Sequence, residues 1–251
     1  MNPHILEWLG LFCLSFAVSM YATVVGGASI VLIPVLNVLG YPLVVSIASN
    51  RVASVVLESV GVIAFARKKA ILWKPALWTA LFTMPSAIVG AQIARHIDPR
   101  ILAYSVAVLL LFVLLLVLRL KKTQLKGDKH QHPSFYLLMA AIAIVLGVYG
   151  GFYGASFSTL IMMCFVFFGG QGLFQASANA SLVTVFMSVS ASITFLIAGQ
   201  VRWNLTIPLI LGGVAGTWIS VNLAYEKGFG WIRNLLVIVI IATIVKLVVS
   251  P

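Results

Sequence analysis

Two glycine clusters, each followed at once by small hydroxyl side chains, are the first positions in the chain that could bind a solute. A helix that begins after such a cluster has unpaired backbone N–H groups and a positive dipole end, which together attract an anion. Glycine also permits close packing of membrane helices, and that interpretation suits Gly90, Gly212 and Gly216. The candidate binding residues of the two clusters are Gly26, Gly27, Ser29, Gly154, Ser156 and Ser158.

A second group of polar residues lies a short distance after each cluster, inside an apolar stretch. Amide and hydroxyl groups at such positions can hold helices together by hydrogen bonds. They could equally replace the hydration of an oxyanion, and their repeated position beside both glycine clusters favours a site. The candidates are Ser49, Asn50 and Arg51 in the first half, and Asn179 and Ser181 in the second.

Glu58 is an ionisable residue in the middle of an apolar segment, with Arg51 seven residues before it on the same helical face. Charged groups at membrane depth are costly, so they are usually paired or functional. Two interpretations stay open. The roles are structural, with Arg51 linked to Glu58 or simply at the helix end, or Arg51 attracts the substrate anion while Glu58 carries a coupled proton.

Other chemistry is not expected. The motifs H-E-x-x-H and G-x-S-x-G are both absent, so the sequence predicts neither a metalloprotease nor a serine hydrolase. The cysteines, Cys13 and Cys164, lie in apolar runs and form no metal-ligand pattern. We therefore expect no enzyme, no cofactor and no metal site. The histidines all fall in loops or at the terminus: His4, His96, His130 and His132.

The amino-acid composition indicates that this chain lies in a lipid membrane and not in water. Of its 251 residues, 62% are hydrophobic and 8% are charged, against about 25% charged in soluble domains. The net charge of +11 comes from basic residues in short loops, which mark the cytoplasmic side of a membrane rather than a nucleic-acid surface. One basic cluster is Arg67, Lys68, Lys69 and Lys74; the other is Arg119, Lys121, Lys122, Lys126 and Lys129.

Ten apolar runs follow one another, and all should be helices, because an exposed strand cannot satisfy its backbone in lipid. The runs from 28 to 40 and from 152 to 168 are too short to span, particularly if the second begins at Gly154. If all ten cross, both termini are outside; if the short ones only dip into the membrane, eight cross and both termini are inside. The runs are 5–25, 28–40, 43–66, 71–94, 101–120, 135–149, 152–168, 173–199, 204–224 and 231–250.

The two halves of the chain share landmarks in the same order, which indicates a duplication. Gly27-Ala28-Ser29 matches Gly154-Ala155-Ser156, Asn50 matches Asn179, and Trp73 matches Trp203. Five segments in each half would make the repeats inverted. The loop at 67–74, with four basic residues, would then lie inside, and its counterpart at 200–204, with only Arg202, would lie outside. We expect an all-α polytopic membrane protein with a first repeat (1–120), a basic cytoplasmic loop (121–134) and a second repeat (135–251).

The chain resembles the sulfite exporter TauE/SafE family of bacterial permeases for sulfonates and related sulfur anions. The similarity rests on Val25-Gly26-Gly27-Ala28-Ser29 leading to Ile33-Pro34, on Ala48-Ser49-Asn50, and on Ile88-Val89-Gly90-Ala91. This resemblance implies an inner-membrane transporter of a sulfur oxyanion or organosulfonate, with the lipid bilayer as its surroundings. A membrane scaffold or assembly factor that transports nothing is the alternative. A polar interior between the halves would favour transport, and a solid apolar bundle would favour the scaffold.

Overall fold

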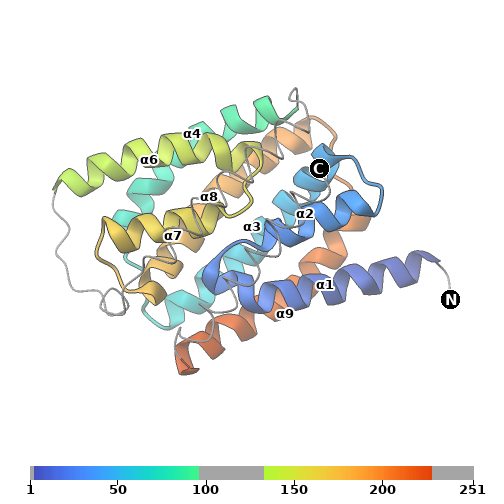
Figure 1. Ribbon diagram of the computed structural model, residues 1–251, viewed down its shortest axis with the longest axis horizontal. Helices are drawn as coiled ribbons and strands as arrows, with labels where there is room; N and C mark the ends of the chain where they lie inside the picture. The colour runs from blue at the N-terminus through green and yellow to red at the C-terminus, as the bar shows by residue number, and fades with distance from the viewer. Residues whose placement is uncertain (1–2, 96–132, 228–251) are drawn as a thin grey trace, which may run out of the picture.

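The computed structural model describes residues 3–95 and 133–227, which form eight helices and no strand (Figure 1). This confirms the all-helical expectation for the described ranges. The expected helices at 101–120 and 231–250, and most of the basic 121–134 loop, lie outside these ranges. The helices are α1 (Pro3–Val25), α2 (Ala28–Val38), α3 (Leu43–Arg67), α4 (Trp73–Ala94), α6 (Pro133–Phe152), α7 (Phe157–Phe167), α8 (Leu173–Ile197) and α9 (Trp203–Lys227).

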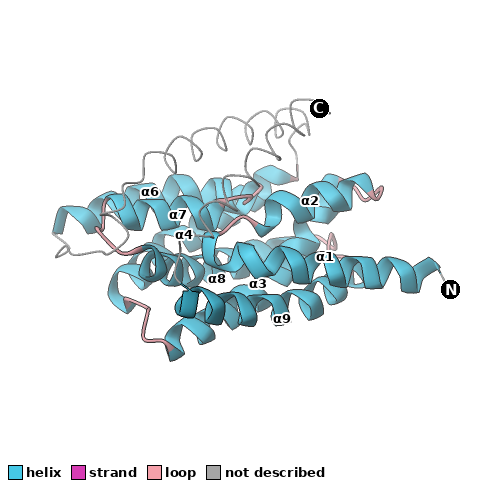
Figure 2. Cartoon of the chain, turned by 60° about the horizontal axis from the view of Figure 1, so that its bottom comes forward, coloured by secondary structure: helices cyan, strands magenta, loops and turns pink. Residues whose placement is uncertain are grey.

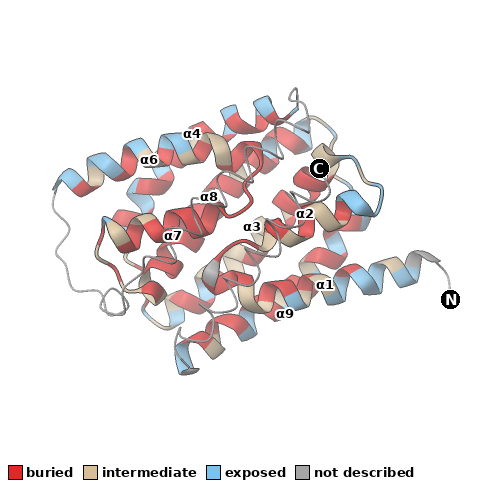
Figure 3. Ribbon diagram, viewed as in Figure 1, coloured by how far each residue is buried: buried red, intermediate tan, exposed pale blue. Residues whose placement is uncertain are grey.

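Six of these helices are long and apolar enough to cross a membrane; α2 and α7, with 11 residues each, are the short ones. The exposed faces are strongly apolar, as at Leu137 and Ile197, whereas many serines and threonines are buried. Buried faces turn toward the interior of the bundle, and exposed faces turn outward (Figure 3). An apolar exterior around a hydroxyl-rich interior is the distribution expected of a chain whose solvent is lipid.

Each short helix folds back along the long helix that precedes it. In the first pair, the Tyr41 hydroxyl, just beyond α2, donates to the Glu7 carboxylate near the start of α1 at 2.5 Å. In the second pair, the ring of Phe135 at the start of α6 packs against that of Phe165 at the end of α7, with centroids 6.4 Å apart. Each pair is therefore a helical hairpin whose two outer ends lie together at the same end of the bundle.

The two central helices, α3 and α8, run antiparallel. The backbone N–H of Leu72, just after α3, donates to Asn179 Oδ1 near the start of α8 at 2.8 Å. Reciprocally, the N–H of Arg202, just after α8, donates to Ser49 Oγ near the start of α3 at 3.0 Å. The end of each helix thus lies beside the beginning of the other.

Outer helices pack across the two halves of the chain: α1 lies along α9, and α4 along α6 (Figure 2). A Cβ at Gly212 would lie 2.1 Å from the Phe12 carbonyl oxygen, and one at Gly151 would lie 1.9 Å from that of Ala87. Gly90 and Gly216 contact facing backbones in the same way. The packing interpretation of Gly90, Gly212 and Gly216 is therefore confirmed.

Two predicted boundaries were wrong. α6 continues to Phe152 instead of ending at Tyr149, and α7 begins at Phe157 instead of within 152–154. The reason is that Gly150 and Gly151 lie inside α6, where they accommodate neighbouring helices without ending the hydrogen-bond ladder.

Candidate functional site

The tip of each hairpin is a short break at which the backbone takes the left-handed conformation. Gly26 and Gly27 have φ of 84° and 95°, a conformation that costs glycine little. The second tip contains Gly154 at φ 69° and, unusually for a residue with a side chain, Ser156 at φ 62°. Gly27 and Ser156 are the N-caps of α2 and α7, and neither helix receives a side-chain cap. Both short helices thus begin inside the bundle without the usual capping group.

The two tips meet inside the bundle. A Cβ at Gly26 would lie 2.5 Å from the backbone nitrogen of Thr159, in the first turn of α7. Only glycine permits so close an approach between the end of α1 and the start of α7. The beginnings of both short helices, predicted as binding elements, are therefore neighbours.

Each tip is held by a central helix from the other half of the chain. Arg51 of α3 donates from Nη2 to the carbonyl oxygen of Tyr153 at 2.7 Å, where α6 has just ended. Ser177 of α8 donates from Oγ to the carbonyl oxygen of Val24 at 2.6 Å, in the last turn of α1. Carbonyls at a helix end lack an intrahelical partner, so these donors satisfy groups that the breaks leave open.

The guanidinium of Arg51 is enclosed at the second tip, with 1% of the residue exposed. It lies against Gly154, where a Cβ would be 1.7 Å from Nη2, and Nη1 is 3.8 Å from the sulfur of Met187. Nε has no hydrogen-bond partner in the part of the chain that the structure describes, and neither does the buried hydroxyl of Ser156. Among the described residues this cation therefore has one oxygen acceptor for its five N–H donors, and oxygens of an anion would complete its hydrogen bonding.

Ser29 and Asn50 join the first tip to the same stretch of α3. Asn50 Nδ2 donates to Ser29 Oγ at 2.8 Å, and Asn50 directly precedes Arg51. Ser158 has the corresponding place in α7, since Ser29 and Ser158 are the second residues of their helices and are equally buried. Of the predicted residues, the structure brings together Gly26, Gly27, Ser29, Asn50, Arg51, Gly154, Ser156 and Ser158 around the tips.

Ser49 and Asn179 have a different environment. Their side chains accept the backbone N–H groups of Arg202 and Leu72 before α9 and α4, and Asn179 also donates to Gln171 Oε1 at 2.7 Å. The observed bonds of these two predicted site residues thus attach loops to the central helices.

The same positions can be compared between the two halves of the chain by their place in each helix. Because α3 begins at Leu43 and α8 at Leu173, Asn179 has the place in α8 that Ser49, and not Asn50, has in α3. The N-caps of the short helices are Gly27 and Ser156, so the triplets Gly27-Ala28-Ser29 and Gly154-Ala155-Ser156 differ by two residues in their place relative to the helix starts. By helix position Arg51 stands opposite Ser181, so the deep guanidinium of the described residues has a neutral counterpart.

Glu58 and Arg51 share a helix face but are not hydrogen-bonded to each other. The Arg51 nitrogens donate to Tyr153 and Met187 or have no partner in the described chain. The half-buried Glu58 interacts with Ser181 of α8, although no full hydrogen bond forms, and Glu58 Oε2 has no partner among the residues described. No direct hydrogen bond thus joins Arg51 and Glu58, although their opposite charges attract each other.

Sequence reasoning missed the acceptors that hold the tips. The carbonyls of Tyr153 and Val24 and the sulfur of Met187 were not predicted as partners. A backbone carbonyl has the same chemistry at every residue, so the residue types at positions 153 and 24 could not indicate that their carbonyls accept these hydrogen bonds. Thr159 and Ser177 are polar like many residues of these helices, and only the packing of the two tips distinguishes them from other buried hydroxyls.

Comparison with known proteins gives one family and several relatives. The family model described as Sulfite exporter TauE/SafE matches residues 11–247. The chain is 26% identical to "Probable membrane transporter protein ORF9" of Sinorhizobium sp, over 99% of this chain and 94% of that protein. It is 24% identical to a "Probable membrane transporter protein" of Haemophilus influenzae, over 95% and 93% of the two chains. With "Probable membrane transporter protein YfcA" of Escherichia coli it shares 24% identity over 91% and 85%. No solved structure matches.

Proposed function

Because the chain belongs to the sulfite exporter TauE/SafE family and is thus a membrane transporter, we propose that it carries a small sulfur oxyanion or organosulfonate between its two hairpin tips. The observation that carries this proposal is the enclosed guanidinium of Arg51 at the beginning of an uncapped helix, where the described residues offer it a single oxygen acceptor. A sulfonate or sulfite offers several oxygens to such a group, and charge-assisted hydrogen bonds to it are strong.

The surroundings of Arg51 supply the rest of the anion site. The first turn of α7 contributes backbone dipole, and Ser156 contributes a hydroxyl that lacks a partner in the described chain. Ser29 and Asn50 approach from the first tip, so the substrate contacts both halves at once. Such a site can open to either face when one half moves against the other.

In this proposal the halves are inverted repeats in the bacterial inner membrane. Antiparallel α3 and α8, and hairpins that begin at opposite ends of the bundle, support the inversion. The basic loop from Arg67 to Lys74 faces the cytoplasm. Since the first hairpin starts and ends together and α3 crosses once to that loop, the start of α1 lies outside. This arrangement agrees, for the start of α1, with the alternative that places the termini outside.

Glu58 is the proposed carrier of a coupled proton. It is the acidic residue that the described chain places deep in the bundle, on the same helix as Arg51 and beside Ser181. Because Glu58 is not hydrogen-bonded to Arg51, its carboxylate can gain and lose a proton while the guanidinium holds the anion. Organosulfonate movement driven by a pH gradient would follow from this arrangement.

The test is transport by the purified protein in proteoliposomes. Sulfite, thiosulfate and an alkyl sulfonate should move saturably and compete with one another, whereas matched carboxylates and monovalent cations should not. Transport of cations in place of anions would contradict the anion site. The scaffold alternative is supported if no solute in the panel moves while the protein elutes as a single folded species.

A further inference from the structure

A groove on the outer surface between α3 and α9 has its own combination of apolar and basic groups. Its volume is about 520 Å³. Ile63, Trp218 and Ile219 are exposed, with between 37% and 51% of each residue accessible. The groove is lined by Val60, Ile63, Val214, Ala215, Trp218 and Ile219. All six are apolar, so the groove suits a hydrocarbon chain.

One end of this groove carries two cations, each placed on an aromatic ring of α9. The guanidinium carbon of Arg67 is 5.0 Å from the centroid of the Trp218 ring. The Lys68 ammonium is 4.4 Å from that of Tyr225. Arg67 follows Val60 by seven residues on α3, and Tyr225 follows Trp218 by seven on α9, so each continues the groove along its helix. The basic side chains therefore lie at one end of the apolar groove, along the same direction as the two helices.

The charge at this end of the bundle is predominantly positive. Lys69 and Lys74 lie in the same loop region, and Glu226 is the acidic residue that the described chain places near them. Long basic side chains at such positions keep their heads at the membrane surface while their stems lie on apolar neighbours. Aromatic residues favour the same interfacial level. The end of the groove thus matches the height and charge of a phospholipid headgroup.

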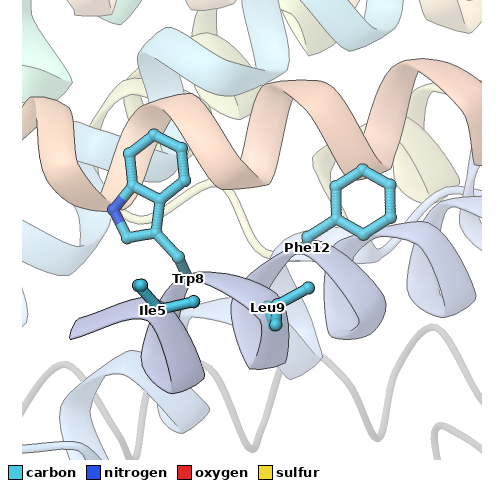
Figure 4. Close-up of a pocket in the computed structure, with 4 residues that line it drawn as sticks. All are labelled: Ile5, Trp8, Leu9 and Phe12. Atoms are coloured by element: carbon cyan, nitrogen blue, oxygen red, sulfur yellow. The ribbon is translucent and has the colours of Figure 1, made fainter. Parts of the chain in front are cut away.

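A second apolar groove, on α1, provides a comparison within the same molecule. It is lined by Ile5, Trp8, Leu9 and Phe12, with a volume of about 360 Å³ (Figure 4). No basic side chain lines it, and the charged residue beside it in the chain is Glu7. Both grooves offer hydrocarbon contact and a tryptophan, but only the α3–α9 groove adds positive charge.

We propose that the α3–α9 groove is a binding site for an anionic phospholipid, with an acyl chain along the groove and the phosphate at Arg67 and Lys68. The seven residues from Val60 to Arg67 span about 10 Å, enough for the upper part of an acyl chain. Arg67 retains its N–H donors for phosphate oxygens while its flat face rests on Trp218. This lipid site does not depend on which anion is transported.

Fluorescence quenching by brominated lipids tests the site in the full-length protein. Both the unmodified protein and Trp218→Phe are reconstituted in bilayers with brominated phosphatidylglycerol or brominated phosphatidylcholine. The fluorescence of Trp218 is the difference between the tryptophan fluorescence of the two proteins. Half-maximal quenching of the Trp218 signal should need about 25-fold less phosphatidylglycerol, about five-fold for each of the two basic side chains at an anionic surface. In Arg67→Gln the preference should fall to about five-fold, because Lys68 remains.

Two controls make the outcome decisive. Lys74→Gln removes an equal charge from the other side of the same loop, where its ammonium lies 5.5 Å from the ring of Tyr136, and should keep the preference. The Trp8 signal, isolated with Trp8→Phe, should respond equally to both lipids. Equal quenching of Trp218 by the two lipids would overturn the proposal. So would an undiminished preference in an Arg67→Gln protein with unchanged melting temperature. Protection of Trp218 from both lipids would instead identify a second protein copy on the groove.

Discussion

At the scale of single residues, the charge of Arg51 is the feature that most needs a partner. A fully buried guanidinium with one carbonyl acceptor carries a desolvation penalty that its observed contacts offset incompletely. A structural arginine would be expected to have its donors paired. A transport arginine must keep donors available, because its partner arrives and leaves. Arg51 Nε and the Ser156 hydroxyl, neither of which has a partner among residues 3–95 and 133–227, fit the second situation.

Arg51→Gln should therefore abolish most substrate binding. Loss of a charge-assisted pair at a buried site costs on the order of 2–4 kcal/mol, or at least about thirty-fold in the apparent affinity for a sulfonate. The measurement is the concentration dependence of initial uptake in proteoliposomes. Arg202→Gln, which removes an exposed charge and leaves the backbone contact of Arg202 with Ser49 in place, is the matched control and should transport normally. Unchanged affinity in Arg51→Gln would exclude Arg51 from the anion site.

Glu58→Gln separates coupling from transport. The amide keeps the shape and the contact with Ser181 but cannot exchange a proton at physiological pH. Accumulation driven by a pH gradient should be lost, while exchange of labelled for unlabelled substrate should continue at more than about half of its original rate, because the groups that hold the anion remain. Glu226→Gln, at an exposed position, should leave both activities intact. If a well-folded Glu58→Gln protein still accumulates substrate in response to pH, Glu58 is not the proton carrier.

At the scale of elements, the hairpin tips depend on backbone conformations that few residues can take. Gly26 combines a positive φ with contact to the Thr159 backbone, so both its torsion and its missing side chain are needed. Ser156 adopts a similar torsion with a side chain present, which is a cost that a purely structural turn would avoid by using glycine. Its unpartnered hydroxyl at that position is consistent with a role in binding.

Gly26→Ala should destabilise the protein and impair transport. A Cβ 2.5 Å from Thr159 N forces the tips apart, and the left-handed torsion adds strain of about 1 kcal/mol or more. Thermal unfolding in detergent should show a clear drop in melting temperature. Gly10→Ala is the control, because no atom lies within 4 Å of the added Cβ in the interior of α1, and it should leave stability equal or slightly raised. Equal melting temperatures for the two variants would mean that the tips do not meet as closely as described.

At the scale of the whole molecule, the bundle reverses the distribution of a soluble protein. Apolar side chains such as Leu137 and Ile197 face outward, and hydroxyl groups face inward. Several of the inward oxygens, including those of Ser46, Ser188 and Ser192, have no hydrogen-bond partner in the described part of the chain. A scaffold would be more stable with these positions apolar. A permeation route needs them, because they can solvate an anion that moves through.

The orientation of the bundle can be measured with single cysteines introduced after Cys13→Ser and Cys164→Ser. Leu39→Cys, in the exposed loop after α2, should react with a membrane-impermeant maleimide in intact cells. Lys74→Cys, exposed in the basic region at the start of α4, should react only after permeabilisation, because short basic loops stay in the cytoplasm. The reverse pattern would invert the topology, and labelling of both sites in intact cells would contradict a single crossing by α3.

Local chemistry made much of this protein predictable from its sequence. Composition identified lipid as the solvent, because 8% charged residues cannot cover a surface in water. The apolar runs located every described helix, since each helix must satisfy its own backbone in lipid. The breaks at Gly26–Gly27 and Gly154 were also predictable, because glycine takes a positive φ at little cost.

What only the tertiary structure decided is which distant groups meet. Arg51 contacts a carbonyl 102 residues away, and that carbonyl carries no mark of residue type. Ser49 and Asn179 looked equivalent to the tip residues, yet their acceptors face loops. The landmarks matched between the two halves differ in helix position by two residues at the tips and by one in the central helices. Small apolar residues recur so often that the sequences of the two halves can be aligned in several ways. Hydrogen bonds between helices form in only one arrangement. Periodicity and composition act along the chain, but a site made by two helix ends exists only once the halves have packed.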